Sequence, residues 1–368
     1  MSLRIGYLCH YSPSPHSGPG RKVLAQCRIW RACGHQVELW VLTRDPAWEA
    51  LAESFPLFCH RWASRWQLPA AWQRLRRRLL RRPLQVLYVR QMPWLPGLGA
   101  LLRRWPSALE IQTDDVAELR SWSPSHLWHR ATRACALHAA SGFVFMTEEL
   151  ACLPHFRARG QPRIVLPNPL PDAVPLPPPP PGAWPRLIML ATPGQEWNGI
   201  DVVLQLAHAL PEFGFDLVGF VRPAGAPASP QVQWHGWLEP AQYRALLAQA
   251  SVGIGTLALW RKRMRQACPL KVREYLAHGL PVIIGYDDPD LPPGVDYALR
   301  LHSGDRGQLA AEDIARVRRF VLSWHGRRIE PSRLSHLRAA VRERRRLAFL
   351  ARLARLPTSS AGVRRWPC

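Results

Sequence analysis

Short apolar runs alternate with helical patterns along the first half of the chain. Residues 4–9 form an apolar run, and apolar residues recur at helical spacing in residues 22–33 after a loop rich in Pro, Ser and Gly. Residues 36–42 then alternate as a second strand. A strand, a helix and a second strand in this order predict a βαβ unit and a parallel sheet. Further runs that would continue the sheet are residues 86–89, 108–111, 142–146 and 163–166.

A proline-rich segment then divides the chain. Residues 167–185 read PNPLPDAVPLPPPPPGAWP, and because proline fixes φ and lacks a backbone donor, this segment cannot be a helix or an interior strand. It predicts a semi-rigid linker between two domains. The alternation of strands and helices restarts after it. The expected strands are residues 187–190, 215–218, 232–234, 252–254 and 281–284, and the expected helices are residues 199–209, 240–249 and 270–278.

This pattern predicts an α/β protein with two Rossmann-like, doubly wound domains that face each other across a cleft. The N-terminal domain would comprise residues 1–166, the linker residues 167–185 and the C-terminal domain residues 186–334. Residues 335–357 form a long Arg-rich helical pattern. Ligands of open α/β sheets bind beyond the carboxyl ends of the strands, so we expect the functional residues there.

Composition adds a strong positive charge to this picture. The 368 residues include 49 Lys and Arg against 26 Asp and Glu, which gives a net charge of +23. Such a chain favours polyanionic partners, namely phosphorylated ligands, anionic lipid surfaces or nucleic acid. No helix-turn-helix, zinc or RNP signature is visible, so we expect no nucleic-acid partner, although a nucleic-acid-binding protein stays as an alternative.

The pattern of cysteines and the length of the apolar runs predict a cytoplasmic protein without a membrane span. The eight cysteines show no CxxC pair and no metal-ligand spacing, which is typical of a reducing cytoplasm, and we expect no metal site. No apolar run reaches the length of a membrane span, and the N-terminus does not resemble a signal peptide. Trp72, Leu75 and Leu79 lie at helical spacing among many arginines. This segment is either an amphipathic helix that binds the inner face of an anionic membrane or a solvated surface helix.

The first loop does not favour a nicotinamide cofactor. Gly18 and Gly20 lead into a helix, but Val23 stands where a dinucleotide fingerprint needs a third small residue. The loop is either able to approach an anion at the helix N-terminus or is an ordinary βα turn.

The most informative segment lies between residues 251 and 290. After a strand and a basic loop, Pro269 opens a helix whose free N–H groups, together with Lys271, would present positive charge to a diphosphate. Glu274 lies one turn further, where a carboxylate can accept hydrogen bonds from both hydroxyls of a ribose. The alternative is a surface helical charge pair.

Residues 269–283, PLKVREYLAHGLPVI, resemble the nucleotide-sugar-binding helix of GT-B glycosyltransferases of the retaining, group-1 (family 4) type. Shorter matches occur in the order and spacing of that family. They are GHQV at residues 34–37, LPN at 166–168, WNGID at 197–201 and HGWL at 235–238.

The resemblance implies a GT-B fold in which the C-terminal helix crosses back to the N-terminal domain. It implies transfer of a sugar from a nucleoside-diphosphate sugar to an acceptor hydroxyl with retention, without a metal and with no cofactor besides that co-substrate. The acceptor would be a glycan or a lipid-linked glycan, in the synthesis of cell-surface polysaccharide.

The resemblance also implies roles for individual residues. Lys271 would neutralise the diphosphate, Glu274 would hold the ribose, and the turn that contains Gly236 and Trp237 would contact the base. The family usually has a second glutamate eight positions before Glu274, and Gln266 stands there. An amide cannot act as a carboxylate, so a catalytically degenerate GT-B binding protein is a further alternative. The other donor-binding candidates are Gly18, Arg261, Lys262, Pro269 and Leu270.

Acceptor-side candidates follow strands of the N-terminal domain. Asp114 and Asp115 come after the run at residues 108–111, and either could orient an acceptor hydroxyl or cap a helix. Glu148 follows the run at residues 142–146 with the same two alternatives, and His16 lies in the first loop.

Overall fold

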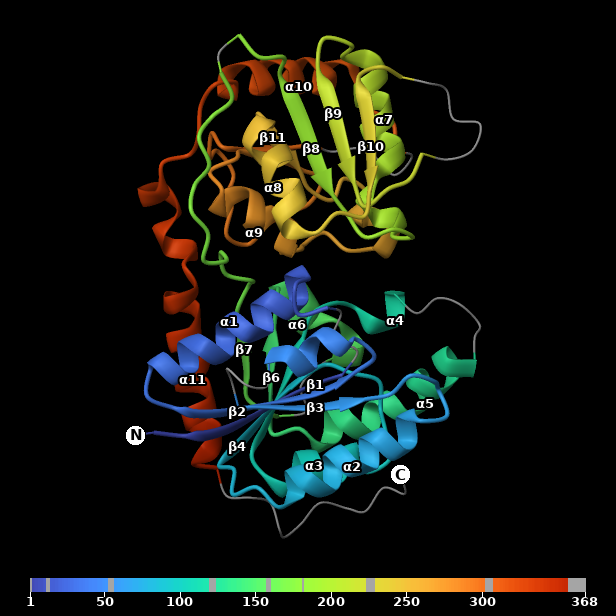
Figure 1. Cartoon of the computed structure of the whole chain (residues 1–368), viewed down its shortest axis with the longest axis vertical. Helices are drawn as coiled ribbons and strands as arrows, with labels where there is room; N and C mark the ends of the chain where they lie inside the picture. The colour runs from blue at the N-terminus through green and yellow to red at the C-terminus, as the bar shows by residue number, and fades with distance from the viewer. Residues whose placement is uncertain are drawn as a thin grey trace. The chain divides into compact units, whose positions relative to one another are not determined.

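The chain forms two compact α/β units. The computed structural model describes residues 2–10, 14–51, 56–118, 124–156, 160–180, 182–222, 229–301 and 307–356. One unit comprises Met1–Leu166 together with Ala340–Cys368, and the other comprises Pro167–Ala339. Each is built on a parallel sheet with helices on both of its faces (Figure 1). The expected doubly wound architecture is therefore confirmed in both halves of the chain.

The N-terminal unit holds a seven-stranded sheet in the order β3-β2-β1-β4-β5-β6-β7, and all its neighbouring strands are parallel. The central strands are almost wholly buried, as apolar strands covered on both faces should be. The strands are β1 (Arg4–His10), β2 (Gln36–Thr43), β3 (Leu57–Arg61), β4 (Val86–Arg90), β5 (Ser107–Ile111), β6 (Gly142–Phe145) and β7 (Arg163–Val165).

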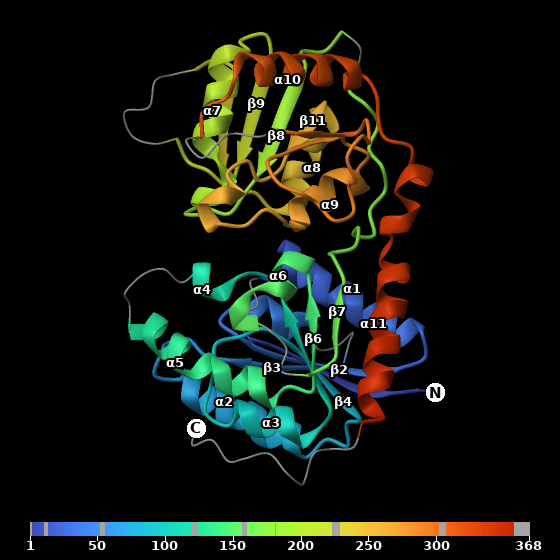
Figure 2. The ribbon, with the colours of Figure 1, turned by 180° about the vertical axis from the view of Figure 1, so that it is seen from behind.

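Helices of the N-terminal unit follow the strands in chain order. They are α1 (Gly18–Ala32), η1 (Pro46–Leu51), α2 (Leu68–Leu80), α3 (Leu98–Arg104), α4 (Asp115–Glu118), α5 (Pro124–Ala139), α6 (Glu148–Cys152) and η2 (Pro154–Phe156). The last helix of the chain, α11 (Ala339–Ala354), returns to this unit, as expected (Figure 2). Its Glu343 accepts a hydrogen bond from the indole of Trp30 in α1 at 2.7 Å.

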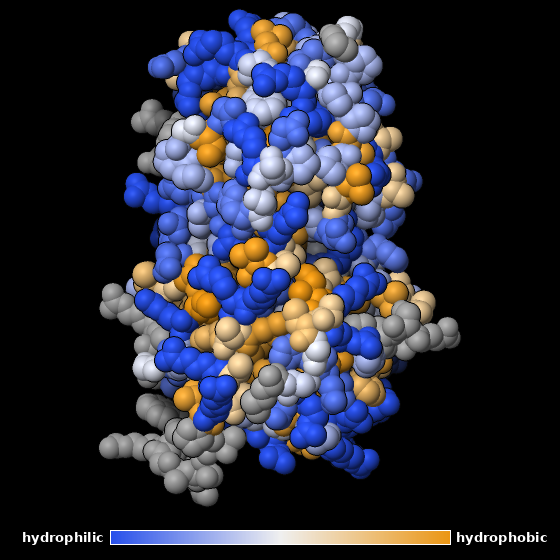
Figure 3. All heavy atoms as spheres, turned by 90° about the vertical axis from the view of Figure 1, so that its left-hand side faces the viewer, coloured by the Kyte–Doolittle hydropathy of each residue, from blue (hydrophilic) through white to orange (hydrophobic). Residues whose placement is uncertain are grey.

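The structure corrects one interpretation of the Arg-rich segment. Trp72, Leu75 and Leu79 of α2 are fully buried, and the indole of Trp72 donates to the carbonyl of Pro96 at 2.8 Å. The apolar side of this helix therefore packs in the protein core and is not available for insertion into a lipid surface. Arg74, Arg77 and Arg78 lie on its exposed side. On the face of the molecule drawn in Figure 3, hydrophilic side chains (blue) lie beside apolar ones (orange). Among the described residues, no helix is long and apolar enough to cross a membrane.

The C-terminal unit holds a six-stranded parallel sheet in the order β10-β9-β8-β11-β12-β13. Its strands are β8 (Arg186–Leu190), β9 (Gly214–Val218), β10 (Val232–Gly236), β11 (Val252–Ile254), β12 (Val282–Ile284) and β13 (Ala298–Arg300). Its helices are η3 (Glu196–Asn198), α7 (Ile200–Ala209), α8 (Pro240–Gln249), η4 (Leu259–Lys262), α9 (Leu270–Ala277), α10 (Ala311–Trp324) and η5 (Pro331–Leu337).

The proline-rich segment begins as part of the C-terminal unit. The amide of Asn168 donates to the Sγ atom of Cys268 at 3.0 Å, and its side chain donates to the Cys268 carbonyl at 2.6 Å. Leu170 pairs with Arg338 in an isolated parallel bridge. The start of this segment, which its composition predicts to be a semi-rigid linker, is thus anchored by specific hydrogen bonds.

Candidate functional site

The helix α9 begins at the carboxyl side of β11, after the basic loop. Pro269 is the cap, with extended backbone at φ −67° and ψ 141°, and Leu270 is the first helical residue. Because proline has no N–H and its φ is already close to the helical value, it starts the helix without leaving a further donor unsatisfied. Lys271 is the second helical residue, so its side chain belongs to the turn whose N–H groups have no partner within the helix.

Lys271 is a desolvated cation with a neutral partner. Its Nζ donates to the Oδ1 atom of Asn198 at 2.8 Å, and burial lowers the pKa of Lys271 to about 7. The side chain of Asn198 is fixed in turn by donation to the carbonyl of Thr192 at 3.3 Å. Gly199 follows at φ +74°, where a Cβ would meet the backbone nitrogen of Ala258 at 3.0 Å, so the turn that places Asn198 requires glycine. An anion that approaches this side chain would stabilise its charged form.

Glu274 lies on the same face of α9, one turn after Lys271. It is 7% exposed, and its Oε1 atom accepts a hydrogen bond from the hydroxyl of Tyr243 in α8 at 2.8 Å. Tyr243 thus fixes the orientation of the carboxylate. The helix brings together the two residues that the sequence singles out most strongly.

Two cations of the basic loop contact neighbouring groups of the C-terminal unit. Arg261 forms a two-pronged ion pair with Asp201, with its Nη2 atom 2.6 Å from Oδ2, and it also donates to the carbonyl of Glu196 at 2.8 Å. The Nζ atom of Lys262 lies 4.4 Å from the ring centroid of Trp197. Both cations hold η4 against η3 within the C-terminal unit, and their role as replacements for diphosphate-binding residues stays a prediction.

The remaining donor-side candidates lie at element ends. Gly18 is the first residue of α1, and the Ser17 hydroxyl that caps this helix accepts from the amide of Gly20 at 3.2 Å. Gly236 ends β10 with φ +63°, and the next residue, Trp237, is 63% exposed.

Gln266 pairs with Asp287 in an isolated parallel bridge just before α9. The amide of Ala267 donates to the Asp287 carbonyl at 3.2 Å, and the amide of Asp287 donates to the Arg265 carbonyl at 2.8 Å. This bridge ties the segment before α9 to the chain beyond β12.

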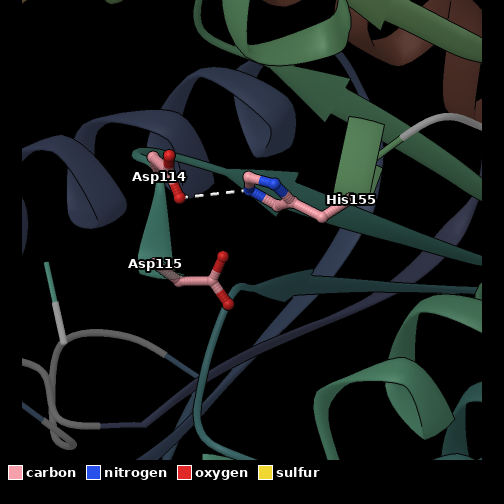
Figure 4. Close-up of side chains that lie close together, drawn as sticks. All are labelled: Asp114, Asp115 and His155. Atoms are coloured by element: carbon pink, nitrogen blue, oxygen red, sulfur yellow. Dashed lines mark hydrogen bonds and ion pairs between the residues drawn. The ribbon is translucent and has the colours of Figure 1, made fainter. Parts of the chain in front are cut away.

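The acceptor-side carboxylates are engaged with neighbouring side chains (Figure 4). The Oδ1 atom of Asp114 caps α4 by accepting from the amide of Val116 at 3.0 Å, and it also contacts the Nε2 atom of His155 at 3.1 Å. Asp115 contacts His129 at 2.6 Å and accepts two bonds of 2.8 Å from Arg133. Burial by itself raises the pKa of Asp115, but these two partners lower it to about 2. Asp115 is therefore an anion that two neighbouring side chains already compensate, and its role in orienting an acceptor stays a prediction.

Glu148 and His16 are both exposed. Glu148 is in the first turn of α6, where the Thr147 hydroxyl accepts from the amide of Leu150 at 3.2 Å. The cap of this helix is thus a threonine, and Glu148 adds favourable charge to its N-terminus. The backbone amide of His16 donates to the Ser14 hydroxyl at 3.3 Å.

Two clusters in the described part of the chain have the residue types of a metal site. In the first, ligand atoms of Asp114, Asp115 and His155 lie within 4.8 Å of one another; the second comprises Cys268, Asp288 and Asp290. An arginine already occupies each cluster, Arg133 on Asp115 and Arg273 on both carboxylates of the second. A guanidinium therefore neutralises Asp115 in the first cluster and both carboxylates in the second, so a metal ion would have to compete with an arginine at each cluster.

A buried ionic cluster joins α11 to the sheet of the N-terminal unit. Glu110 accepts from Lys22 at 2.9 Å and from Arg346 at 3.2 Å, and Arg346 also donates to Glu343 at 3.0 Å and to Tyr88 at 2.6 Å. Burial by itself raises the pKa of Glu110, but the charges of Lys22 and Arg346 lower it to about 2. Burial lowers the pKa of Lys22 to about 8, although Glu110 opposes this effect.

Several of these contacts involve residues that the sequence reasoning does not single out as site residues. Asn198 lies within the matched motif WNGID, and that position was its only signal. Tyr243, His155 and the Glu110 cluster carried no signal, because their partners are distant in the sequence.

No protein-family model matches the chain, and no curated protein is similar to it in sequence. Solved structures are similar to it in fold. A glycosyltransferase from Rickettsia africae ESF-5 has a TM-score of 0.62 at 10% identity, over 96% of this chain and 99% of that one. Anabaena Alr3699/HepE in complex with UDP and glucose has a TM-score of 0.60 at 14% identity, over 96% of this chain and 100% of that one. An alpha-glucosyltransferase in complex with UDP and a DNA 13-mer has a TM-score of 0.60 at 10% identity, over 95% and 99%.

These similarities extend over nearly the whole chain. They agree with the two parallel sheets and the returning C-terminal helix described above. The chain therefore has the GT-B fold.

Proposed function

We propose that this chain is a glycosyltransferase that moves a sugar from a nucleoside-diphosphate sugar to an acceptor hydroxyl. The observation that carries the proposal is Lys271, a desolvated ammonium at the first turn of α9 with only a neutral amide recorded as its hydrogen-bond partner. Transfer requires stabilisation of the negative charge that develops on the departing diphosphate. A positioned cation and the N–H groups of a helix N-terminus stabilise that charge directly.

The second residue in support is Glu274. A carboxylate held by Tyr243 on the face of Lys271 is suited to accept hydrogen bonds from a ribose. A structure of the same fold, Anabaena Alr3699/HepE, was crystallised with UDP and glucose, which favours a nucleotide sugar as the donor by fold-level analogy.

The finer features of the proposal follow the resemblance to family 4. The transfer proceeds with retention and without a metal, because Lys271 and the helix N-terminus supply the positive charge. The acceptor is a glycan or a lipid-linked glycan of cell-surface polysaccharide synthesis. The protein works in the cytoplasm, where the arginines of α2 can contact the anionic inner face of the membrane through charge alone.

Nucleotide binding is the first test. UDP, GDP, ADP and CDP are compared by thermal denaturation, and a nucleotide present at tens of its Kd should stabilise the protein by about 2 kcal/mol. Release of nucleoside diphosphate from a panel of donor sugars then measures turnover. Lys271→Ala should lower turnover more than tenfold, because a hydrogen bond to a charged group contributes roughly 1.5–3 kcal/mol. Unchanged turnover in this variant would remove Lys271 from the reaction.

The presence of Gln266 in place of a glutamate raises the alternative of a degenerate protein, which the same two measurements test. If the chain binds a nucleotide but releases no diphosphate with any donor, it is a GT-B binding protein in which the amide of Gln266 does not replace a carboxylate. Gln266→Glu then tests the cause, because restored turnover would assign the defect to this one position.

A nucleic-acid acceptor is the second candidate. The net charge of +23 favours a polyanion, and a glucosyltransferase of the same fold was crystallised with DNA. A DNA mobility shift that persists at physiological ionic strength, together with donor turnover stimulated by that DNA, would favour it over a glycan acceptor.

A further inference from the structure

Two adjacent carboxylates of the N-terminal unit each hold a histidine, but they do so in different surroundings. Asp115 contacts the Nε2 atom of His129, whose side chain is 7% exposed. Asp114 contacts the Nε2 atom of His155, whose side chain is 29% exposed. One pair is therefore enclosed in the fold, and the other presents its imidazole to the surroundings.

The contact with Asp114 determines which ring nitrogen of His155 can accept a hydrogen bond from a ligand. A carboxylate accepts hydrogen bonds, so the Nε2 atom of His155 carries the proton that it shares with Asp114. In the neutral ring, Nδ1 then carries the lone pair and can accept a hydrogen bond from a hydroxyl. Figure 4 shows the contact between the ring and Asp114, and an oxygen of Asp115 lies within 4.8 Å of ligand atoms of both residues.

The backbone of His155 is also held in place. Arg133, which binds Asp115, donates from Nη1 to the carbonyl of His155 at 3.4 Å, and its guanidinium lies 4.9 Å from the ring centroid of Phe156. The ring of His155 is thus positioned by one carboxylate and its backbone is positioned through the other. A side chain fixed at both ends loses little entropy when it binds a ligand.

The topology places this pair where a parallel sheet binds its ligands. Asp114 follows the carboxyl end of β5, and His155 lies in η2, which follows β6 and α6. β5 and β6 are neighbours in the sheet, so their carboxyl ends lie at the same edge. Ligands of open α/β sheets bind beyond that edge.

We propose that His155, positioned by Asp114, binds a hydroxyl of the acceptor through its Nδ1 atom. This inference rests on the proposed function, since it assigns the acceptor side of the same transfer. His155 binds and orients the hydroxyl, and Asp114 is a positioning residue that acts through the imidazole. Asp115 and His129 hold the fold around them.

The test measures the acceptor separately from the donor. Release of nucleoside diphosphate is followed with a panel of p-nitrophenyl glycosides as acceptors, and UDP binding is followed by thermal denaturation. His155→Ala should raise the acceptor KM about tenfold, because the hydroxyl loses its hydrogen-bond partner. It should leave the unfolding temperature and the stabilisation by UDP as in the wild type. His155→Gln, which keeps an acceptor oxygen, should recover part of the affinity.

Two histidines of α5 provide matched controls. His129→Ala should lower the unfolding temperature, because it removes a buried partner of Asp115. His138 lies on the exposed side of the same helix, so His138→Ala should change neither stability nor the acceptor KM.

The outcomes separate the inference from the proposed function. An acceptor KM unchanged in His155→Ala, in a wild type that transfers sugar, overturns the role of His155 and leaves the proposed function standing. A fall in stability equal to that of His129→Ala also overturns it, because His155 would then be structural. A wild type that neither binds nucleotide nor releases diphosphate overturns the proposed function, and the role of His155 falls with it.

Discussion

One lysine of each unit is removed from water, and the two are compensated in different ways. In the N-terminal unit, Glu110 contacts both Lys22 and Arg346, and Arg346 also contacts Glu343, so each charge faces an opposite one. In the C-terminal unit, the ammonium of Lys271 contacts the amide oxygen of Asn198. The charges of the first arrangement are compensated without a ligand, whereas an anionic ligand would add an opposite charge to the second. Buried charge marks a binding site where its compensation is incomplete.

Lys22, which is buried, and Lys271, which is half-buried, show the physical basis of this difference. The side chain of Lys22 is only 4% exposed, and burial lowers its pKa to about 8. The negative charge of Glu110 opposes this effect and limits the fall in the pKa. Burial lowers the pKa of Lys271 further, to about 7, with no opposing charge. A diphosphate beside Lys271 would supply the opposing charge that Glu110 supplies to Lys22.

The largest expected effect is the loss of a partner from the complete cluster. Arg346→Ala leaves Glu110 and Glu343 with less compensation in the protein interior, and it should lower the free energy of unfolding by about 3–5 kcal/mol. Denaturant unfolding measures this change. Arg344→Ala, an exposed arginine of the same helix, is the control and should change stability by less than about 0.5 kcal/mol. Equal effects of the two variants would show that the cluster adds nothing to stability.

The next effect is the pH dependence of nucleotide binding. Because the pKa of Lys271 is lowered to about 7, the ammonium is present below this pH and is lost above it. A bound diphosphate favours the charged form, so binding takes up a proton above pH 7. The Kd for UDP should therefore rise by up to about tenfold per pH unit between about pH 7 and pH 9. Titration calorimetry in buffers of different ionisation enthalpy measures the proton uptake.

Lys271→Arg is the matched control for this pH dependence. Arginine stays charged over the whole range, so the variant should bind UDP with a much flatter pH profile. The same steep profile in both proteins would assign the titration to another group. In the absence of nucleotide, the stability of the wild type should rise with pH above about 7, because the unfolded chain then binds the proton of this lysine more strongly than the folded chain does.

The smallest expected effect concerns Arg261. Its ion pair with Asp201 is partly exposed, and such pairs contribute about 0.2–1 kcal/mol. Arg261→Ala should lower stability within this range and change the donor KM by less than about threefold. A tenfold rise of the donor KM would instead indicate that Arg261 binds the diphosphate, and the contrast with Lys271 would be weaker.

Most of the fold could be predicted from the periodicity of apolar residues. The central strands β1, β5 and β8 lie in short, mostly apolar runs, because both faces of a parallel sheet are covered. The edge strands β3 and β13 are not predicted, and most of their residues are only half-buried. A partly exposed edge strand carries a weaker pattern than an interior one, which explains the omission. The helix α10 is also absent from the predicted elements.

The site could be predicted in part. Lys271 and Glu274 are visible because they share a short helix that follows a proline. Asn198 lies 73 positions away from Lys271, and His155 lies 41 positions away from Asp114, so neither pair has a local signature. Arg261 is charged and close to α9 in sequence, yet its partner Asp201 engages it.

The sequence by itself therefore determined two parallel α/β units, the helix that carries Lys271 and Glu274, and the excess of positive charge. These properties depend on local periodicity and composition, which every segment carries within itself. Only the tertiary structure decided which charges are already compensated, because compensation depends on partners that come together from distant parts of the chain. It paired Arg261 with Asp201 and Asp115 with Arg133, buried the apolar side of α2, and brought Lys271 to Asn198 and His155 to Asp114.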